Sequence, residues 1–202
     1  MLSQNTLQEG NIIPSIVFKF RTRNTSNDEN PFEWMDVTTE ELFKNKRCIL
    51  FALPGAFTPI CSSYHLPNFE KMYPALKQYN IDEIYCLSVN DAFVMRKWGL
   101  DQNLPEDKTP YSLGFKNVKL IPDGACLFTR AMGMSCTWTS ERGFGERSWR
   151  YSAIINDMKI EKLFVEEPMI ENSKDDPYEV SSVENMLKYL VDLNGDTVIN
   201  LT

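Results

Sequence analysis

The segment KRCILFALPGAFTPICSSYHLP, residues 46–67, joins a short apolar run to the start of a helical pattern through a sharp break. Its first part, KRCILFAL at 46–53, is rich in strand-forming residues and predicts a buried parallel strand. The pair Pro54-Gly55 ends that strand. The pair Thr58-Pro59 then marks a helix start, because a hydroxyl residue suits the cap and proline suits the first helical position. The segment therefore predicts a strand, a tight loop and a helix in direct succession.

Apolar residues at helical spacing continue this helix to Tyr79, and Pro67 is expected to kink or restart it. Downstream, EIYCLSV at 83–89 predicts a second buried strand, with Asn90 or Asp91 capping the helix behind it. The remaining predicted elements are a strand and turn at 118–124, a β-hairpin formed by 150–155 and 159–165, and a last helix that begins at a capping box of Ser181 and Glu184.

This order of strands and helices predicts an α/β fold in which helices flank a central mixed β-sheet. A thioredoxin-like layout fits it and places the loop at 54–60 at the carboxyl end of a strand, where such sheets hold their sites. No internal repeat or long linker divides the sequence. We therefore expect a single domain spanning residues 1–202.

The sequence is acidic, with a formal net charge of −7 and a pI of about 4.9. Nucleic acids and anionic membranes attract basic surfaces, so neither is expected as a partner. No apolar run reaches the length of about eighteen residues that predicts a membrane-spanning helix. The opening MLSQNTLQEG lacks the basic and apolar regions of a signal peptide, which favours a cytoplasmic protein.

The cysteines form an odd-numbered set without CxxC spacing: Cys48, Cys61, Cys86, Cys126 and Cys136. Such a set is not typical of a secreted disulfide framework and suits a reducing compartment. One histidine and scattered cysteines give no paired ligand spacing, so we expect no metal site.

Cys61 falls in the first turn of the predicted helix after the loop. A thiol reacts as its thiolate, and the dipole and free N–H groups at a helix start favour negative charge. A nearby guanidinium would add to this effect. Free cysteines are also among the most buried residue types, so this context alone leaves two roles open, a nucleophile and a core residue.

The stretch PGAFTPICSSYHLP resembles the active-site segment of peroxiredoxins, whose P-x-x-x-T/S-x-x-C motif falls on Pro54, Thr58 and Cys61. Further segments resemble the type II, or peroxiredoxin-five, subfamily and follow its order over nearly the whole chain: PFEWMDVTTEELFKNKR, DEIYCLSVNDAFVMRKW, LIPDG, RAMGM, GFGERSWRYS and DPYEVSSVENMLKYL. The resemblance implies reduction of hydrogen peroxide and alkyl hydroperoxides by a protein thiol, with no cofactor.

The same resemblance implies a role for each residue of the motif. Cys61 is the peroxidatic cysteine, which attacks the peroxide O–O bond and becomes a sulfenic acid, while Thr58 hydrogen-bonds and orients the peroxide. Arg150, in SWRYS, stabilises the thiolate and the reacting oxygens, and Pro54 limits solvent access. Backbone N–H groups of Ile60 and Cys61 complete the oxygen pocket, as oxyanion donors do.

Two further polar residues lie close to these in the sequence. Arg147 shares the segment GERSWRYS with Arg150, and we expect it to be a solvated surface charge. His65 lies four residues after Cys61, on the same helix face, where we expect packing or hydrogen bonding rather than metal binding or base catalysis.

A sulfenic acid returns to the thiol only through a second thiol. Some members of the subfamily carry this resolving cysteine near the C-terminal helix, but SKDDPYEVSSVENM, at 173–186, has none. Cys86 is the next candidate, although its strand context favours a core residue. Cys126 and Cys136 flank LFTRAMGM in an expected surface region and are interpreted as incidental. We therefore expect an external reductant, glutathione with glutaredoxin in preference to thioredoxin.

Two other functions use the same cysteine. A peroxide sensor or redox relay needs the same thiolate, so the sequence does not separate it from an enzyme. A thioredoxin-like disulfide reductase is disfavoured because Tyr64 and Thr58 stand where a CxxC partner of Cys61 would be. The subfamily resemblance also implies a homodimer, with the loop at 55–60 and the helix containing Phe93 near the contact.

Overall fold

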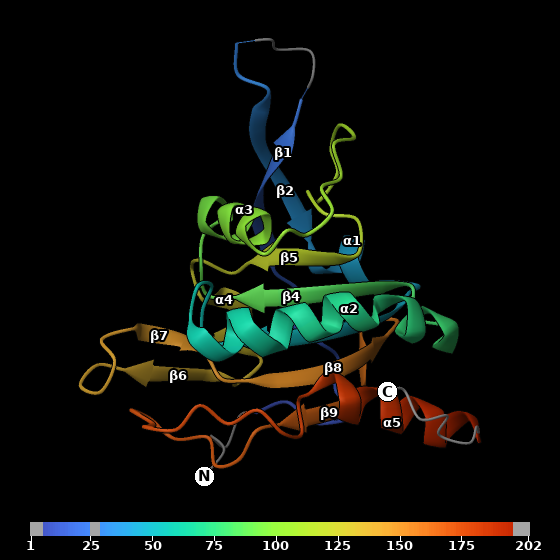
Figure 1. Cartoon of the computed structure of the whole chain (residues 1–202), viewed down its shortest axis with the longest axis vertical. Helices are drawn as coiled ribbons and strands as arrows, with labels where there is room; N and C mark the ends of the chain where they lie inside the picture. The colour runs from blue at the N-terminus through green and yellow to red at the C-terminus, as the bar shows by residue number, and fades with distance from the viewer. Residues whose placement is uncertain (1–5, 25–28, 196–202) are drawn as a thin grey trace.

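The computed structural model describes residues 6–24 and 29–195, so residues 1–5 of the N-terminal segment discussed above lie outside the description. A five-stranded sheet with the order β5-β4-β3-β8-β9 occupies the centre (Figure 1). β3, β4 and β5 are parallel, whereas β8 runs antiparallel to β3 and β9 antiparallel to β8. This confirms the predicted central mixed sheet. The strands are β3 (Arg47–Leu53), β4 (Glu83–Ser88), β5 (Val118–Pro122), β8 (Tyr151–Asn156) and β9 (Lys159–Val165).

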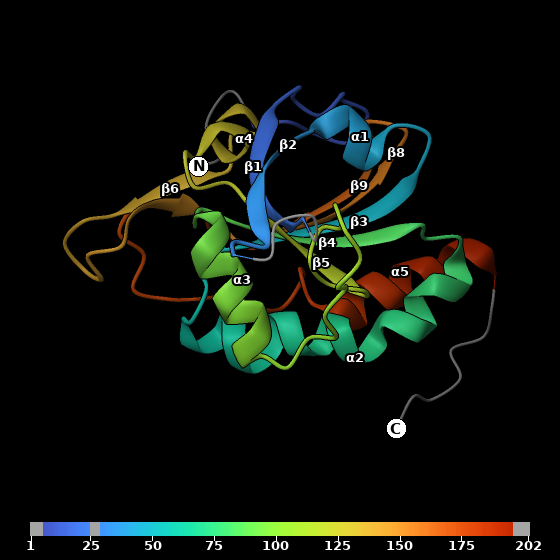
Figure 2. The ribbon, with the colours of Figure 1, turned by 90° about the horizontal axis from the view of Figure 1, so that it is seen from above.

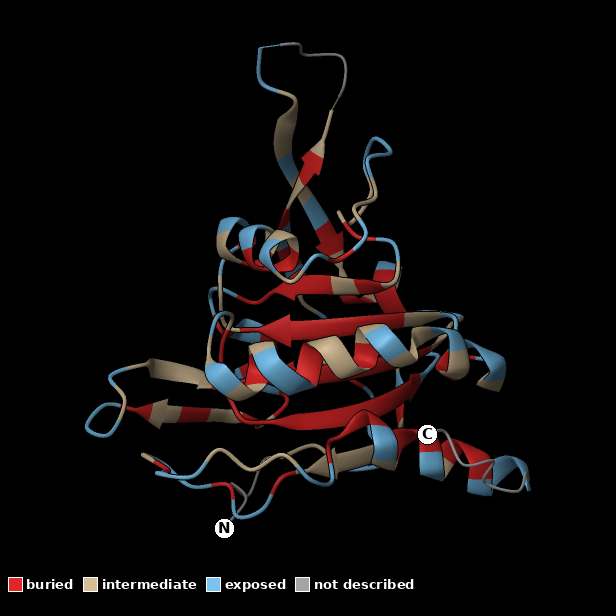
Figure 3. Ribbon diagram, in the orientation of Figure 1, coloured by how far each residue is buried: buried red, intermediate tan, exposed pale blue. Residues whose placement is uncertain are grey.

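β3 lies in the middle of this sheet and is buried at every position after Arg47. The neighbouring strands β4 and β8 are also mostly buried (Figure 3). Successive side chains of a strand point to opposite faces. Accordingly, Cys48, Leu50 and Ala52 join one apolar cluster, and the residues between them join the other. A strand with both faces covered has a continuous apolar sequence, which is why KRCILFAL predicts it so directly.

Different elements cover the two faces, as Figure 2 shows. One face carries α2 (Leu66–Leu76), α3 (Ala92–Asp101) and α5 (Val183–Asn194), whose apolar residues share a cluster with Cys61. The other face carries β1 (Val17–Arg23), β2 (Phe32–Thr38), α1 (Thr39–Phe43) and α4 (Leu127–Ala131). The helices thus flank the sheet as predicted.

A second hairpin, β6 (Ser135–Trp138) with β7 (Gly145–Ser148), leads directly into β8. Neither this hairpin nor β1, β2, α1 and α4 was predicted from the sequence. These elements are short or lie at the sheet's periphery, so their own apolar patterns are weak. β7 nevertheless matters for function, because Arg150 follows it by two residues.

The structure shows which residues cap two of the helices. Asp91, rather than Asn90, caps α3, and its carboxylate accepts the N–H groups of Phe93 and Val94 at 2.8 and 2.9 Å. The predicted capping box at Ser181 is wrong by one residue, since Ser182 caps α5. The Ser181 hydroxyl instead donates to a buried carboxylate, described below.

Across residues 6–24 and 29–195, the helices are all too short or too polar to cross a membrane.

We predict that Asp91→Ala lowers the free energy of unfolding by about 1 kcal/mol, because two N–H groups of α3 lose their acceptor. Asp101→Ala, at the exposed opposite end of the same helix, is the matched control. A carboxylate is unfavourable at a helix C-terminus, so this change should be neutral or slightly stabilising. Urea unfolding of both variants measures the difference, and equal losses would contradict the capping role.

Candidate active site around Cys61

The loop after β3 delivers Cys61 at the start of a helix. Residues 59 and 60 are helical, 61–65 form a π-helical turn and α2 follows without a break. The predicted helix start at Pro59 is therefore confirmed. Pro67, expected to kink or restart the helix, lies in the first two positions of α2, directly after the π turn. Because proline has no N–H and crowds the carbonyl four residues before it, a regular α-turn is strained there, and the wider π turn replaces it.

The Cys61 side chain is fully buried, with 0% of its surface exposed. It belongs to the apolar cluster under α2, α3 and α5, yet a guanidinium reaches it: Arg150 Nη1 lies 3.5 Å from Cys61 Sγ. The two residues predicted to act together are thus adjacent, although they lie 89 positions apart in the sequence.

Arg150 sits between β7 and β8 with only 1% of its surface exposed. Its Nη1 also faces His65 Nδ1 at 3.0 Å, and its Nη2 donates to the Asp176 carboxylate. The Tyr178 ring lies 5.9 Å from the guanidinium carbon. Burial opposes the charge on Arg150, but the sulfur of Cys61 and the carboxylate of Asp176 outweigh it and raise the pKa of the guanidinium. Arg150 therefore stays cationic beside the sulfur.

The other predicted site residues line the same loop. The Thr58 hydroxyl donates to the Gly55 carbonyl at 2.7 Å, and Pro54 is buried. The N–H groups of Ile60 and Cys61 fall within the first four of the helix that begins at Pro59, which have no partner within the helix. The loop is thus placed to present a hydroxyl and N–H groups next to the sulfur, and the roles of these groups remain predictions.

His65 is buried and packs among aromatic rings, with ring centroids 4.8 Å from Phe51 and 5.0 Å from Tyr178. Burial, reinforced by the charge of Arg150, holds the pKa of His65 well below its usual range. The neutral ring accepts the Arg150 hydrogen bond through Nδ1, so the predicted packing and hydrogen-bonding role is confirmed.

The expectation that Arg147 is a solvated surface charge is wrong. Arg147 is half-buried rather than solvated, and it donates to the carbonyls of Phe144 and Val89 at 3.1 Å each. A Cβ placed on Gly55 would lie 3.4 Å from Arg147 Nη1, so this arginine packs directly on the active-site loop. One of its two backbone acceptors comes from a distant segment, which is why the residues around it in the chain did not predict this placement.

The remaining cysteines are buried free thiols, which corrects the expected surface placement of Cys126 and Cys136, only 3% and 2% exposed. Burial raises the pKa of Cys126 to about 12 and that of Cys136 to about 11. Cys86 lies in the same apolar cluster as Cys61, where burial and then the charge of Cys61 raise its pKa well above the usual range. Within residues 6–24 and 29–195, no group of His, Cys, Asp or Glu is arranged to hold a metal ion.

Asp176 and Tyr178 complete the surroundings of Arg150 and were not predicted from the sequence. Both lie in the segment DPYEVSSVENMLKYL that carries the family resemblance, but no spacing rule connects them to Arg150. Their contact depends on how the long segment between β9 and α5 crosses the sheet edge.

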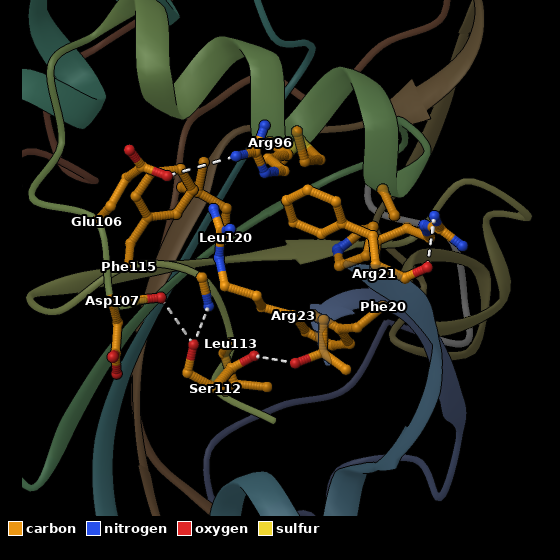
Figure 4. Close-up of a pocket in the computed structure, with 16 residues that line it drawn as sticks. Phe20, Arg21, Arg23, Arg96, Glu106, Asp107, Ser112, Leu113, Phe115 and Leu120 are labelled. Atoms are coloured by element: carbon orange, nitrogen blue, oxygen red, sulfur yellow. Dashed lines mark hydrogen bonds and ion pairs between the residues drawn. The ribbon is translucent and has the colours of Figure 1, made fainter. Parts of the chain in front are cut away.

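A cavity of about 40 Å³ lies apart from this site, between the β1–β2 hairpin, α3 and residues 105–115 (Figure 4). Its lining includes Arg23 and the ion pair of Arg96 with Glu106, but none of the residues around Cys61. It therefore contributes nothing to the chemistry at the thiol.

We predict that the free energy of unfolding falls as the pH drops below about 6.5, the ordinary pKa of an unfolded histidine. His65 resists protonation in the fold, so the unfolded chain binds the extra proton and acid favours unfolding. The slope should approach about 1.4 kcal/mol per pH unit. Urea unfolding from about pH 7.5 to about pH 5.5 brackets that pKa and measures the slope. His65 is the single histidine, so His65→Asn should remove the slope, and an unchanged slope would contradict this assignment.

Comparison with known proteins places the chain in a family. The Redoxin family model matches residues 8–187. A peroxiredoxin of Rhizobium etli is 51% identical over 179 residues, which cover 88% of this chain and 93% of that protein. The hybrid peroxiredoxin hyPrx5 of Haemophilus influenzae is 42% identical over 182 residues, which cover 90% of this chain and 66% of that protein.

Solved structures agree with these relatives. The 1-Cys peroxiredoxin of Plasmodium falciparum superimposes with a TM-score of 0.79 at 33% identity, covering 91% of this chain and 99% of that one. Reduced Prx3 of Vibrio vulnificus in complex with hydrogen peroxide gives 0.74 at 32% identity, covering 94% and 99%. The chain therefore belongs to the peroxiredoxin family, in its type II or peroxiredoxin-five group, and is a thiol-dependent peroxidase with a thioredoxin-like fold.

Proposed function

We propose that Cys61 is the peroxidatic cysteine and that the protein reduces hydrogen peroxide and alkyl hydroperoxides as a single domain spanning residues 1–202. The contact of Arg150 Nη1 with Cys61 Sγ at 3.5 Å carries this proposal. It places a permanent cation against a thiol at a helix start, and both features favour the thiolate. The complex of Vibrio vulnificus Prx3 with hydrogen peroxide supports the substrate class.

The reaction is a displacement at oxygen. The Cys61 thiolate attacks one peroxide oxygen, the O–O bond breaks, and the second oxygen leaves as hydroxide or alkoxide and takes a proton to become water or alcohol. Cys61 becomes a sulfenic acid, two electrons more oxidised. Negative charge moves from sulfur to the leaving oxygen, so fixed donors around the oxygen pair lower the barrier.

The neighbouring groups supply those donors. Arg150 lies close enough to the sulfur to stabilise the negative charge there and then on the leaving oxygen. The N–H groups of Ile60 and Cys61 belong to the first helical turn, and the Thr58 hydroxyl orients the peroxide after exchanging its bond to Gly55. Buried Pro54 restricts water at the loop.

We further propose that the sulfenic acid is reduced by glutathione with glutaredoxin, in preference to thioredoxin. None of the other four cysteines is exposed, and Cys86 lies in a central strand of the sheet. A disulfide requires Cα atoms within about 7 Å and suitable side-chain directions, which strand pairing and core packing restrict. The structural neighbour from Plasmodium falciparum is a 1-Cys peroxiredoxin, which supports this proposal.

We also propose that the protein forms a homodimer and works in the cytoplasm. Phe57 and Phe93 are 50% and 59% exposed, and the Phe93 ring packs edge-on against exposed Trp34 at 5.5 Å. Exposed aromatic side chains of this kind favour a protein interface. They support the homodimer implied by the resemblance. Five free thiols favour the cytoplasm.

A peroxide sensor that relays oxidation to a partner is the second candidate, because it uses the same thiolate. The buried sulfur favours neither function. Repeated turnover with a small-molecule or protein reductant identifies an enzyme, whereas a sensor stops after one equivalent of peroxide.

We predict that the wild type consumes peroxide over many turnovers with glutathione and glutaredoxin, and more slowly with thioredoxin. Cys61→Ser should abolish consumption with every reductant, because the nucleophile is lost. Cys48→Ser, a change of the same kind in the apolar strand before the loop, is the matched control and should keep turning over. Activity that survives in Cys61→Ser would overturn the assignment of the nucleophile.

We predict that one equivalent of peroxide followed by glutathione adds a single glutathione to the protein, at Cys61. Intact mass and peptide mapping detect the adduct. Cys86→Ser should give the same adduct as the wild type. A disulfide between Cys61 and Cys86, without a glutathione adduct, would show that the resolving thiol is internal.

A further inference from the structure

The segment from Glu166 to Ser182, called here the strap, joins β9 to α5 and crosses the edge of the site. The β6–β7 hairpin holds its first half. There the Asn172 N–H donates to the Thr137 carbonyl at 2.8 Å, and the Trp138 indole donates to the Ser173 carbonyl at 3.0 Å. These bonds fix the strap's backbone just before Asp176.

A buried carboxylate holds the other half of the strap. Glu166 Oε1 accepts the N–H groups of Glu179 and Ser181 at 2.7 and 2.8 Å, together with the Ser181 hydroxyl. The strap is therefore fixed on both sides of Asp176. This explains how a residue in irregular backbone comes to occupy a defined position.

Asp176 uses that position to bind Arg150. Its Oδ1 accepts from Arg150 Nη2, and its Oδ2 lies 3.9 Å from Arg142 Nη1. Among the described residues, Asp176 is the carboxylate paired with Arg150. A guanidinium is planar, so fixing Nη2 also fixes the plane in which Nη1 meets Cys61 and His65.

We propose that Asp176 is a positioning residue of the peroxidase reaction, which orients the Arg150 guanidinium toward the sulfur and the incoming peroxide. The proposal rests on the function proposed above. The side-chain contacts of Asp176 are with Arg150 and Arg142 rather than with the sulfur, so it acts on Cys61 through Arg150.

The carboxylate has two effects of opposite sign. By holding Nη2 it sets the orientation of Arg150, which favours the reaction. By neutralising part of the guanidinium charge it weakens the attraction between Arg150 and the thiolate. Loss of the charge on Asp176 should therefore make Cys61 easier to ionise and, at the same time, slower to react with peroxide. A mere loss of folding would not produce this combination.

The charged and titratable groups around Cys61 and Arg150 come from four places. Arg150 precedes β8, His65 closes the π turn, Cys86 lies in β4, and Asp176 and Tyr178 lie in the strap. His65 is neutral, and the pKa values of Cys86 and Tyr178 are raised, so none of these three changes charge in the range where a reactive thiol ionises. A shift in that range on changing Asp176 therefore reports on Arg150.

The test compares Asp176→Asn with Asp175→Asn, which removes the same charge from the neighbouring strap residue. Asp175 has no ion pair within the described part of the chain, and its N–H bonds to the Ser173 hydroxyl. Ultraviolet absorbance of the thiolate against pH, corrected with Cys61→Ser, follows ionisation. Stopped-flow mixing with hydrogen peroxide gives the second-order rate constant.

We expect Asp176→Asn to ionise Cys61 at lower pH and to slow the peroxide reaction by roughly 10- to 100-fold, the loss that a small misplacement of a reacting group causes. Asp175→Asn should change neither by more than about two-fold. Asp176→Glu, which keeps the charge, should return ionisation toward the wild type and restore part of the rate.

A peroxide rate unchanged by Asp176→Asn would overturn the proposal. So would an equal slowing by Asp175→Asn, because the contact with Arg150 would then not be the cause. A lower rate accompanied by ionisation at higher pH would show that Arg150 has moved away from the sulfur, which supports the positioning role and contradicts only the predicted direction of the charge effect. If the wild type itself fails to reduce peroxide, the proposed function fails. The absorbance titration still shows whether Asp176 acts on Cys61 through Arg150, so the two failures are distinguishable.

Discussion

The rest of the site depends on one interaction, the contact between the buried guanidinium of Arg150 and the sulfur of Cys61. A charge with 1% exposure is costly unless its hydrogen-bonding groups are occupied. The two terminal nitrogens of Arg150 meet this requirement with a thiol and a neutral imidazole from the loop and helix after β3, and with a carboxylate from the strap, whereas its Nε has no hydrogen-bond partner among the described residues. The same arrangement that makes the buried charge tolerable also keeps it directed at the reacting atom.

The central sheet makes this convergence possible. β3 and β8 are antiparallel neighbours in which Ala52 pairs with Tyr151. The end of β3 therefore lies beside the beginning of β8, so the loop carrying Cys61 and the residue preceding Tyr151 emerge at the same edge. Thioredoxin-like topology thus converts two sequence-distant motifs into neighbours.

Site residues that lie close together in the sequence could be predicted from it, whereas contacts between distant segments could not. Cys61, Thr58 and Pro54 belong to one local motif with a strand before it and a helix after it, so they could be placed from sequence. Arg150 was found through family resemblance to its own segment. Two other contacts join residues far apart in the sequence and follow no repeating pattern. They are the hydrogen bond of Arg147 to the Val89 carbonyl, just after β4, and the ion pair of Asp176 with Arg150. They depend on the path of the hairpin and the strap, which no periodicity encodes.

The complete burial of Cys61 restricts access to the sulfur differently for the peroxide that oxidises it and for the thiol that reduces it afterwards. A peroxide is a few atoms long and approaches an enclosed sulfur through small fluctuations of the loop. A tripeptide or a protein thiol is far larger and meets the sulfur only after the enclosure has opened. With the reductant proposed above, opening of the enclosure limits the return of oxidised Cys61 to the thiol once that reductant is plentiful.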